Sequence, residues 1–389
     1  MCTNPCLPPP ITAASAASAD ASSSAPSHPA NSAAASAASW TLKWHKPAGK
    51  APATELVEDP SGGRSVLTAR VPEKWLNMHI TTQGGGVSVT RVVEADLVVR
   101  THGGAVTLGT VRANAARIDS RLDGGKDGVI VGGEVSGSDV LLQSGTGGLK
   151  LRRFVAQRGQ ATASGTGCIN IGALYGEGVA LSTGLGSIDV GMMDCGSNVM
   201  ASPGADSSSG SSEAAPAPGT QTSHSSSATQ HGQPPSGDGV CAVLSSKGGV
   251  ISVRGLDGNA RVSSGGGAIL LHLYANVREV SVASEGGPVS LALAGDVSVR
   301  IDVSNAQNVE CLDGIELQYD SATQSYTGTL QPTHTYQPHH RVLPGSVMGH
   351  VKVDAGATGV VTLKRVSWME ALQARVTATA AEKAAAASQ

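Results

Sequence analysis

Aromatic side chains are scarce in this sequence. Phe, Trp and Tyr together make up 3% of the 389 residues, and Phe154 is the single phenylalanine. Bulky rings fill much of the interior of an ordinary globular domain, so their shortage favours a narrow core. The four tryptophans, Trp40, Trp44, Trp75 and Trp368, lie towards the two ends of the chain. That placement is typical of caps that cover the ends of an elongated fold.

The chain has no excess of charge of either sign. Its 27 Lys and Arg residues nearly balance 30 Asp and Glu residues, which gives a net charge of −3. Arg152, Arg153 and Arg158 form the one local basic cluster in the sequence, and no aromatic stacking platform accompanies them. We therefore expect no nucleic-acid partner. A run of 18 apolar residues is also missing, so we expect no transmembrane segment.

The start of the chain has no basic segment followed by an apolar core, and we expect no secretory signal. Residues 1–39 are rich in Ala, Ser and Pro and carry one acidic residue, Asp20. This composition is similar to that of an organellar transit segment, although no arginine precedes Arg64. We therefore expect an intracellular protein of the cytoplasm or of an organelle such as the mitochondrion or plastid.

None of the six cysteines belongs to a CxxC pair. They are Cys2, Cys6, Cys168, Cys195, Cys241 and Cys311. We expect small buried side chains or free thiols in a reducing compartment. A disulfide or a metal site is the alternative.

A short unit recurs along the chain at nearly constant spacing. SGTGCINIG (164–172) is followed by TGLGSIDVG (183–191), and in each copy two apolar residues, two positions apart, follow a glycine turn. The pairs are Val87/Val89, Val106/Leu108, Val129/Val131, Leu149/Leu151, Ile169/Ile171, Ile188/Val190, Ile251/Val253, Ile269/Leu271, Val289/Leu291 and Val361/Leu363. Seven of the nine intervals between pairs are 18–23 residues long, which is the sign of a stacked repeat.

The spacing within each unit predicts strands, because apolar residues at i and i+2 share one face of a strand. Each repeat also holds a second alternating run that ends in Ser or Thr, as in ARIDS (116–120) and VALST (179–183). Stacking such strand-turn-strand-turn repeats buries one continuous apolar column. We predict an all-β fold, a single parallel β-solenoid of ten to twelve rungs of about 20 residues each.

The domain organisation follows from where the repeat begins, stops and resumes. Residues 1–39 are expected to form a disordered tail and residues 40–75 an N-terminal cap. The solenoid should cover residues 76–372. Within it, the Ser/Pro/Gly-rich residues 203–239 are expected to form a disordered insertion between two rungs. The Ala-rich residues 373–389 should form a helical or frayed tail.

The interval between Val289 and Val361 contains further alternating sequence. We expect one additional rung there, followed by an outward-projecting β-hairpin over residues 314–330. The stretch GVVTLKRV (359–366) should then form the final rung. After it, residues at helical spacing predict a short C-terminal helix that docks over the end of the solenoid: Val366, Met369 and Leu372.

Two features of the sequence could suggest a metal or cofactor site: a run rich in histidine, and the many glycines. THTYQPHH contains His334, His339 and His340, and imidazole is a zinc ligand. The prolines in this run favour a surface loop over a metal site. No glycine run precedes Lys-Ser or Lys-Thr, which argues against a phosphate-binding loop. The residue between the paired apolar positions varies from copy to copy, unlike in calcium-binding β-rolls or regular ice-binding faces. We expect no metal ion and no cofactor.

Sugar-cleaving β-helices share the predicted architecture and use paired carboxylates. The nearest such group here is Asp119, Asp123 and Asp127. Asp119 should point outward from its strand, and the other two lie in the glycine-rich turn LDGGKDG (122–128). We prefer solvated turn carboxylates over a catalytic group.

The rungs SSKGGVISVRGL (245–256) and RTHGGAVTLGTV (100–111) resemble those of the adhesin-like domain family, a mainly bacterial family with eukaryotic relatives. The closing GVVTLKRVSWMEAL (359–372) is similar to the end of the eukaryotic relatives. The resemblance spans about residues 75–372. It implies a β-solenoid and offers no catalytic residue to assign.

The sequence thus predicts a non-enzymatic scaffold or binding protein without catalytic, cofactor-binding or metal-binding residues. Its partner would be an unidentified macromolecule, either a protein or a glycan. The alternative is a carbohydrate-active enzyme, a polysaccharide lyase or hydrolase, on the same fold.

Overall fold

The structure is a computed structural model of the whole chain. It describes residues 77–122, 128–195, 241–274, 276–332 and 348–367, together with Glu370 and Gln373. For the strands at 40–45, 53–58 and 65–70 it describes the backbone course only. The predicted disordered tail and insertion, and nearly all of the predicted C-terminal helix, lie outside these residues.

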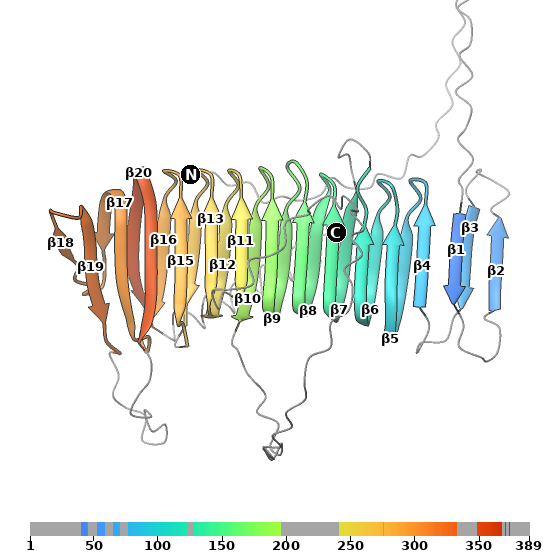
Figure 1. The fold of residues 1–389 in the computed structure, drawn as a ribbon, viewed down its shortest axis with the longest axis horizontal. Coiled ribbons are helices and arrows are strands. Elements are labelled where there is room, and N and C mark those ends of the chain that lie inside the picture. The colour runs from blue at the N-terminus through green and yellow to red at the C-terminus, as the bar shows by residue number, and fades with distance from the viewer. Residues whose placement is uncertain are drawn as a thin grey trace, which may run out of the picture.

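The described residues form twenty strands (Figure 1). In chain order they are β1 (Trp40–His45), β2 (Ala53–Glu58), β3 (Ser65–Arg70), β4 (Asn77–Thr82), β5 (Val87–Arg100), β6 (Val106–Asp119), β7 (Val129–Ser144), β8 (Gly148–Ala163), β9 (Ile169–Thr183), β10 (Ile188–Cys195), β11 (Ala242–Ser246), β12 (Ile251–Gly258), β13 (Ala260–Ser264), β14 (Ile269–Leu273), β15 (Glu279–Ser284), β16 (Val289–Ala294), β17 (Val299–Cys311), β18 (Gln318–Asp320), β19 (Ser325–Leu330) and β20 (Gly349–Val366). All except the β2–β3 hairpin belong to one sheet.

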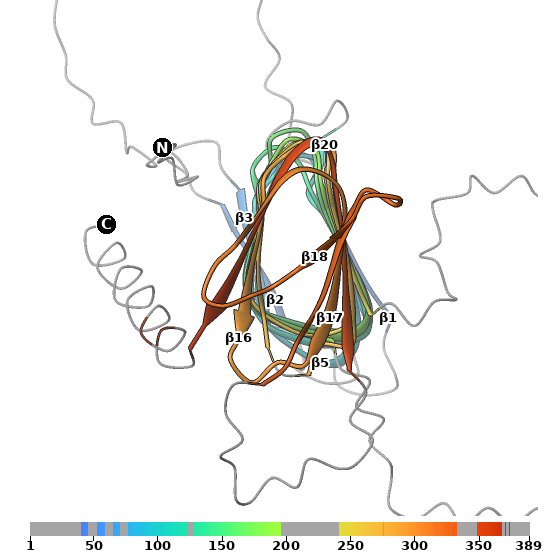
Figure 2. The same ribbon diagram turned by 90° about the vertical axis from the view of Figure 1, so that its left-hand side faces the viewer.

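That sheet winds into a parallel β-solenoid, as the sequence predicts. The units that follow the glycine turns stack into one wall, wall A, in which Ile188 of β10 lies between Ile169 of β9 and Ile251 of β12. The runs that end in Ser or Thr stack into a second wall, wall B, as where β11 lies between β9 and β13. The long strands β5 to β9 bend from wall A into wall B of the next turn, and the view along the axis shows both walls enclosing a narrow interior (Figure 2).

Eight successive turns, from Leu97 to Leu293, repeat this pattern of wall B followed by wall A. One rung precedes them, made by β4 and the start of β5. Two more rungs, from β20 and β17, follow. The described residues therefore contain eight regular turns, with further stacked strands at both ends.

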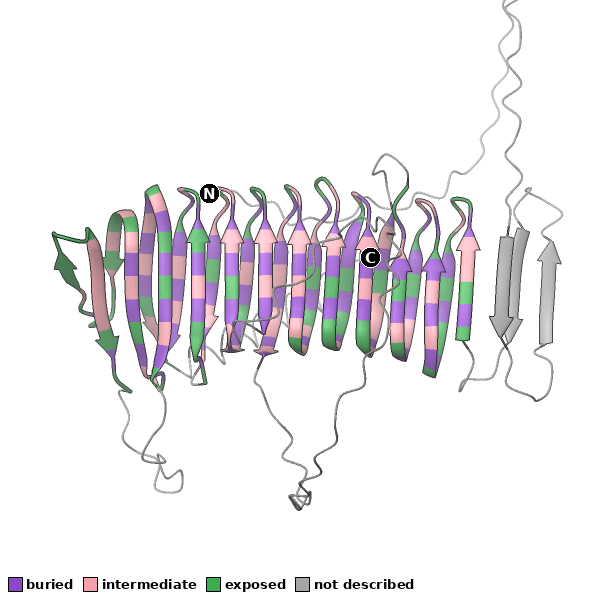
Figure 3. Cartoon of the chain, in the orientation of Figure 1, coloured by how far each residue is buried: buried purple, intermediate pink, exposed green. Residues whose placement is uncertain are grey.

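The interior is the predicted apolar column, and buried residues alternate with less buried ones along the strands (Figure 3). Ile169, Ile171, Ile188 and Val190 are all fully buried, whereas the intervening Asn170 is exposed. Full burial of one such side chain is worth about 1.5–3 kcal/mol. Repeating that burial at each rung holds the two walls together.

One rung has a register different from the predicted one. The sequence predicts Val129 and Val131 inside, but Ile130 is fully buried and Val131 is 42% exposed. Gly132 then occupies the second inward position, where an added Cβ would lie 2.6 Å from a methyl carbon of Leu151. A shift of one residue moves every side chain of a strand to the opposite face. In the sequence, the segment between Ser120 and Ile130 is longer than the corresponding segments before the neighbouring strands.

Most wall B strands of the regular turns end in a buried Ser or Thr, and three of these residues close the following turn. The hydroxyl groups of Thr101, Thr183 and Ser284 donate to the backbone carbonyls of Gly104, Gly186 and Gly287 at 2.6–2.9 Å. These hydroxyls satisfy backbone groups that the stacked turns would otherwise leave unpaired.

Successive turns approach so closely that glycine is required at one position. A Cβ on Gly249 would lie 2.0 Å from the carbonyl oxygen of Gly186 in the preceding turn. At the adjacent Gly248 the nearest atom would be 3.4 Å away, an ordinary contact. The requirement therefore comes from turn stacking and falls on one glycine of the pair.

The order of the last rungs corrects the sequence prediction. The expected final rung, in β20, lies between β16 and β17: Val361 of β20 pairs with Val289 on one side and with Val309 on the other. β20 separates β17 from β15 in the same way. Both β17 and β20 carry the alternating apolar pattern, so periodicity alone does not determine which of them lies on the eighth turn.

The expected outward hairpin is also placed differently. β19 pairs antiparallel with β17 along its outer edge, from Val299–Leu330 to Ser304–Ser325, and β18 pairs with β19. The hairpin therefore covers the end of wall B. Its pairing satisfies backbone groups that an uncovered edge strand would leave unpaired. At the opposite end β1 pairs antiparallel with β4, where the sequence predicts a cap. The Trp side chains of that cap lie outside the described side chains.

The chain beyond β20 begins with a helix-capping interaction. The Ser367 hydroxyl accepts a hydrogen bond from the Glu370 backbone N–H at 3.2 Å, and Glu370 Oε2 accepts one from the Ser367 N–H at 2.9 Å. This reciprocal pair is a capping box, a signal for a helix N-terminus. The predicted docking residues Met369 and Leu372 lie outside the described residues.

Candidate binding surface

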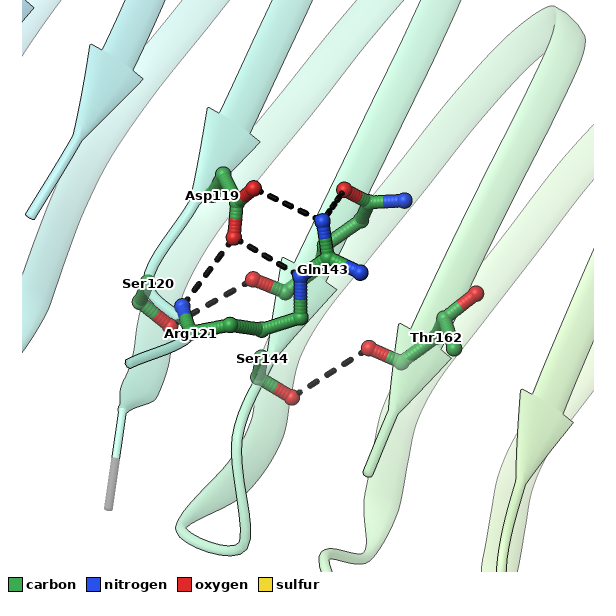
Figure 4. Close-up of polar contacts among 6 residues, drawn as sticks. All are labelled: Asp119, Ser120, Arg121, Gln143, Ser144 and Thr162. Atoms are coloured by element: carbon green, nitrogen blue, oxygen red, sulfur yellow. Dashed lines mark hydrogen bonds and ion pairs between the residues drawn. The ribbon is translucent and has the colours of Figure 1, made fainter. Parts of the chain in front are cut away.

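Asp119, the one predicted candidate carboxylate that the structure describes, is held in an ion pair (Figure 4). Arg121 Nε and Nη2 donate to its two carboxylate oxygens at 2.9 and 2.8 Å, and the Arg121 backbone N–H donates at 3.0 Å. Arg121 also donates to the side-chain oxygen of Gln143 in the next turn. Burial raises the pKa of Asp119, but the hydrogen bonds and charge of Arg121 outweigh it and hold the pKa below its usual value. Asp119 is therefore an anchored anion and a poor proton donor.

Other candidates from the sequence lie outside the described residues. They are Asp123, Asp127, His334, His339, His340, Cys2 and Cys6. Of the remaining cysteines, Cys195 and Cys241 are buried, and Cys168 and Cys311 are partly buried. Burial raises the pKa of Cys195, Cys241 and Cys311, which keeps these thiols protonated and unreactive.

Ion pairs link neighbouring turns on the outside of the solenoid. Arg158 of β8 lies 2.7 Å from Asp139 of β7, and Arg254 of β12 lies 2.7 Å from Asp189 of β10. Exposed pairs of this kind contribute about 0.2–1 kcal/mol each. Their main effect is to neutralise charge and to fix side chains across rungs.

The basic cluster on the surface differs from the one in the sequence. Arg158 lies past the corner of wall A and is paired with Asp139. Lys150 and Arg152 instead lie on wall A, and Arg153 follows at its corner, where the alternation breaks; all three are exposed and belong to one strand. The Arg153 guanidinium lies over the ring of Tyr175, 5.0 Å from its centroid. Within the described part of the chain, no carboxylate forms an ion pair with any of these three cations.

Two aspartates that the sequence analysis did not single out lie side by side on β10 and β12, beyond the end of wall A. Asp194 of β10 and Asp257 of β12 are direct register partners in adjacent strands, which places them about 4.8 Å apart along the sheet. Asn276 Nδ2 donates to Asp257 at 3.0 Å. The signal was present in the sequence, because Asp194 and Asp257 both stand six positions after the first apolar residue of their units, Ile188 and Ile251. The long insertion between those units obscured it.

The shifted carboxyl groups in the described residues share one direction. Besides Asp119, the pKa of Asp302 is lowered, because hydrogen bonds from His350 and Arg300 outweigh the burial that raises it. The pKa values of Asp320 and Glu370 are lowered by hydrogen bonds from neighbouring backbone and hydroxyl groups. A general acid needs a pKa near the working pH, and these four carboxyl groups are shifted away from it.

The comparisons with known proteins identify no relative. No family model matches this chain, and neither does any curated protein or solved structure. Among the described residues no group of three or more His, Cys, Asp or Glu side chains is arranged to hold a metal ion. No helix in that part of the chain is long and apolar enough to cross a membrane. A function must therefore be inferred from the surface itself.

Proposed function

We propose that this protein is a non-enzymatic binding scaffold whose wall A binds an anionic macromolecule through Lys150, Arg152 and Arg153. The observation that carries the proposal is the clustering of three exposed cations on one strand, without an ion-paired carboxylate in the described residues. The exposed arginines Arg121, Arg158 and Arg254, by contrast, are paired with Asp side chains across or within turns. The unneutralised cations attract an anionic partner.

The strand that carries the cations is well suited to hold them in place. β8 pairs along its whole length with β7 on one side and β9 on the other. Phe154, fully buried behind Arg153, anchors it in the core. Such preorganisation lowers the entropic cost of binding. Extended rigid surfaces are also what stacked-repeat proteins present to their partners.

The repeat motifs support the same function by resemblance. The adhesin-like domain family, which the rungs resemble, suggests binding rather than catalysis, with a glycan or a protein as the partner. Arg is suited to both, because its guanidinium forms paired hydrogen bonds with carboxylate or sulfate groups. The contact with the Tyr175 ring helps to hold the Arg153 guanidinium in place.

The proposal is tested by retention on two immobilised probes, heparin as an acidic polysaccharide and polyglutamate as an acidic polypeptide. The variant Lys150→Gln/Arg152→Gln/Arg153→Gln should lose retention at low salt. The matched control Arg100→Gln/Arg117→Gln/Arg261→Gln removes the same charge from separate strands of wall B, where all three arginines are exposed. It should bind like the wild type. Equal retention of both variants would contradict the proposal, since net charge would then explain binding.

A second candidate function is polysaccharide cleavage, which the stacked carboxylates Asp194 and Asp257 favour. A retaining glycosidase uses a pair of carboxyl groups, one as the nucleophile and the other as the acid and base, and Asp194 and Asp257 occupy adjacent register positions. The variant Asp194→Asn/Asp257→Asn tests it. Loss of a wild-type cleavage activity in this variant, with the fold retained, would support the enzyme.

A further inference from the structure

The end of the solenoid contains a rung supplied from a distant part of the chain. β17 follows β16 in sequence, yet in the described residues it pairs with β20 and β19, and not with β15 or β16. β20 fills the space between them in both walls (Figure 1). β17 therefore contacts the eight regular turns through β20. We call the position that β20 fills, between β17 on one side and β15 and β16 on the other, the acceptor site; it is one strand wide in each wall.

Side chains on both sides of that acceptor site recognise β20. Lys352 forms an ion pair with Glu279 of β15 at 3.4 Å. His350 Nε2 lies 2.6 Å from Asp302 of β17, and Asn305 of β17 donates to Asp354 at 3.1 Å. Inside the solenoid β20 contributes fully buried apolar residues: Val351, Val353, Ala355, Val361 and Leu363. Charge, hydrogen bonding and shape thus select one strand sequence.

The connection to β20 is long for the distance it covers. Leu330, the last residue of β19, and Gly349, the first of β20, both pair with Val299, on its two opposite sides. The two ends are thus about two strand spacings apart, roughly 10 Å. The eighteen residues between them, 331–348, have an extended contour of about 60 Å. A connection of this length reaches its own acceptor site or that of a neighbouring molecule.

We propose that the acceptor site binds β20 of a second copy of this chain, which gives a reciprocal, strand-exchanged dimer. An exchanged β20 makes the same ion pairs and buries the same side chains, because the two chains are identical. The two forms differ only in the path of residues 331–348 and in the entropy of association, so the dimer fraction rises with protein concentration. The partner is therefore another molecule of this protein.

Cysteine cross-linking of co-expressed full-length chains tests the proposal. Ser281 of β15 and Lys352 of β20 are register partners with outward side chains. One copy carries Ser281→Cys and one affinity tag, and the other carries Lys352→Cys and a second tag. A short bis-alkylating thiol reagent should yield a product of twice the chain mass that bears both tags. A fourfold higher expression level should increase its fraction.

Two controls make each outcome decisive. The single-chain variant Ser281→Cys/Lys352→Cys should cross-link internally, which shows that the reagent spans the pair. Co-expression of Ser281→Cys with Lys364→Cys should give no two-tag product, because Lys364 pairs with Ala292 in wall A. Internal cross-linking of the double variant without a two-tag product from the Ser281→Cys and Lys352→Cys copies would overturn the proposal. A two-tag product in the Lys364→Cys control would overturn it as well, since it would indicate nonspecific contact.

Discussion

Ile188 and Ile251 are register partners in adjacent turns, although 62 residues separate them in the chain. The pairing of β10 with β12 continues to Cys195 and Gly258, and β11 takes its place between β9 and β13. The solenoid thus passes the site of the long insertion without loss of register. Neighbouring turns close with only a few residues, so residues 203–239 have no counterpart in them.

Deletion of residues 203–239 should therefore leave the fold intact. The stacking of β9, β10, β11 and β12 does not require them, and loop length has a weak effect on stability, about 0.6 kcal/mol for each doubling. The melting temperature of the deletion variant should be close to that of the wild type. In limited proteolysis of the wild type the first cleavage should fall between residues 203 and 239. A deletion variant that fails to fold would show that the segment is structural.

Truncation of an inward side chain should destabilise the protein far more than truncation of its outward neighbour. Ile169 is fully buried and Asn170 is exposed, so Ile169→Ala should lower the free energy of unfolding by about 2–5 kcal/mol. Asn170→Ala should change it by less than about 0.5 kcal/mol. Chemical denaturation of both variants measures the difference. Equal effects would be incompatible with the wall A register.

Two adjacent glycines should respond differently to an added methyl group. Gly249→Ala places its Cβ against the carbonyl oxygen of Gly186, whereas Gly248→Ala meets only ordinary contacts. Overpacking of this kind costs about 1–3 kcal/mol, so Gly249→Ala should melt at a clearly lower temperature than Gly248→Ala. Similar melting temperatures for the two would argue against the close stacking of these turns.

The ion pair between Asp119 and Arg121 should contribute to stability only above acidic pH. The pKa of Asp119 is lowered in the folded protein, so its contribution is present above the unfolded value of about 3.9. It is lost as pH falls through the folded pKa. Because both side chains are about one-third exposed or more, the effect should not exceed about 1 kcal/mol.

Unfolding curves of the wild type and Asp119→Asn at pH 7 and at pH 2 test this contribution. The variant should be less stable than the wild type at pH 7, and the difference should disappear at pH 2. A constant difference at both pH values would mean that the carboxylate charge has no part in it.

The fold was predictable because its determinants are local and repeated. The alternation of Ile169 with Ile171 fixes the strand face, and the glycine turns fix the strand ends. The shifted register at Ile130 was not predictable, because three consecutive apolar residues, Val129 to Val131, satisfy two registers equally well. The position of β20 depends on contacts between residues about 70 positions apart, such as Glu279 with Lys352, which no local pattern encodes.

The candidate binding surface was harder to predict from the sequence than the fold was. Arg152 and Arg153 were visible as a cluster, but the sequence grouped them with Arg158 in place of Lys150. Strand alternation and the corner of the wall decide which of these side chains share a face. The pairing of Asp194 with Asp257 likewise required the register across the insertion.

The chain length of heparin recovered after incubation with the protein distinguishes binding without cleavage from enzymatic cleavage. Heparin retained by the wild type is eluted with salt, and its chain length is compared with that of heparin kept without protein. We expect recovery at full length, together with loss of retention in Lys150→Gln/Arg152→Gln/Arg153→Gln. Shortened chains from the wild type, restored to full length by Asp194→Asn/Asp257→Asn, would contradict it and identify the protein as an enzyme.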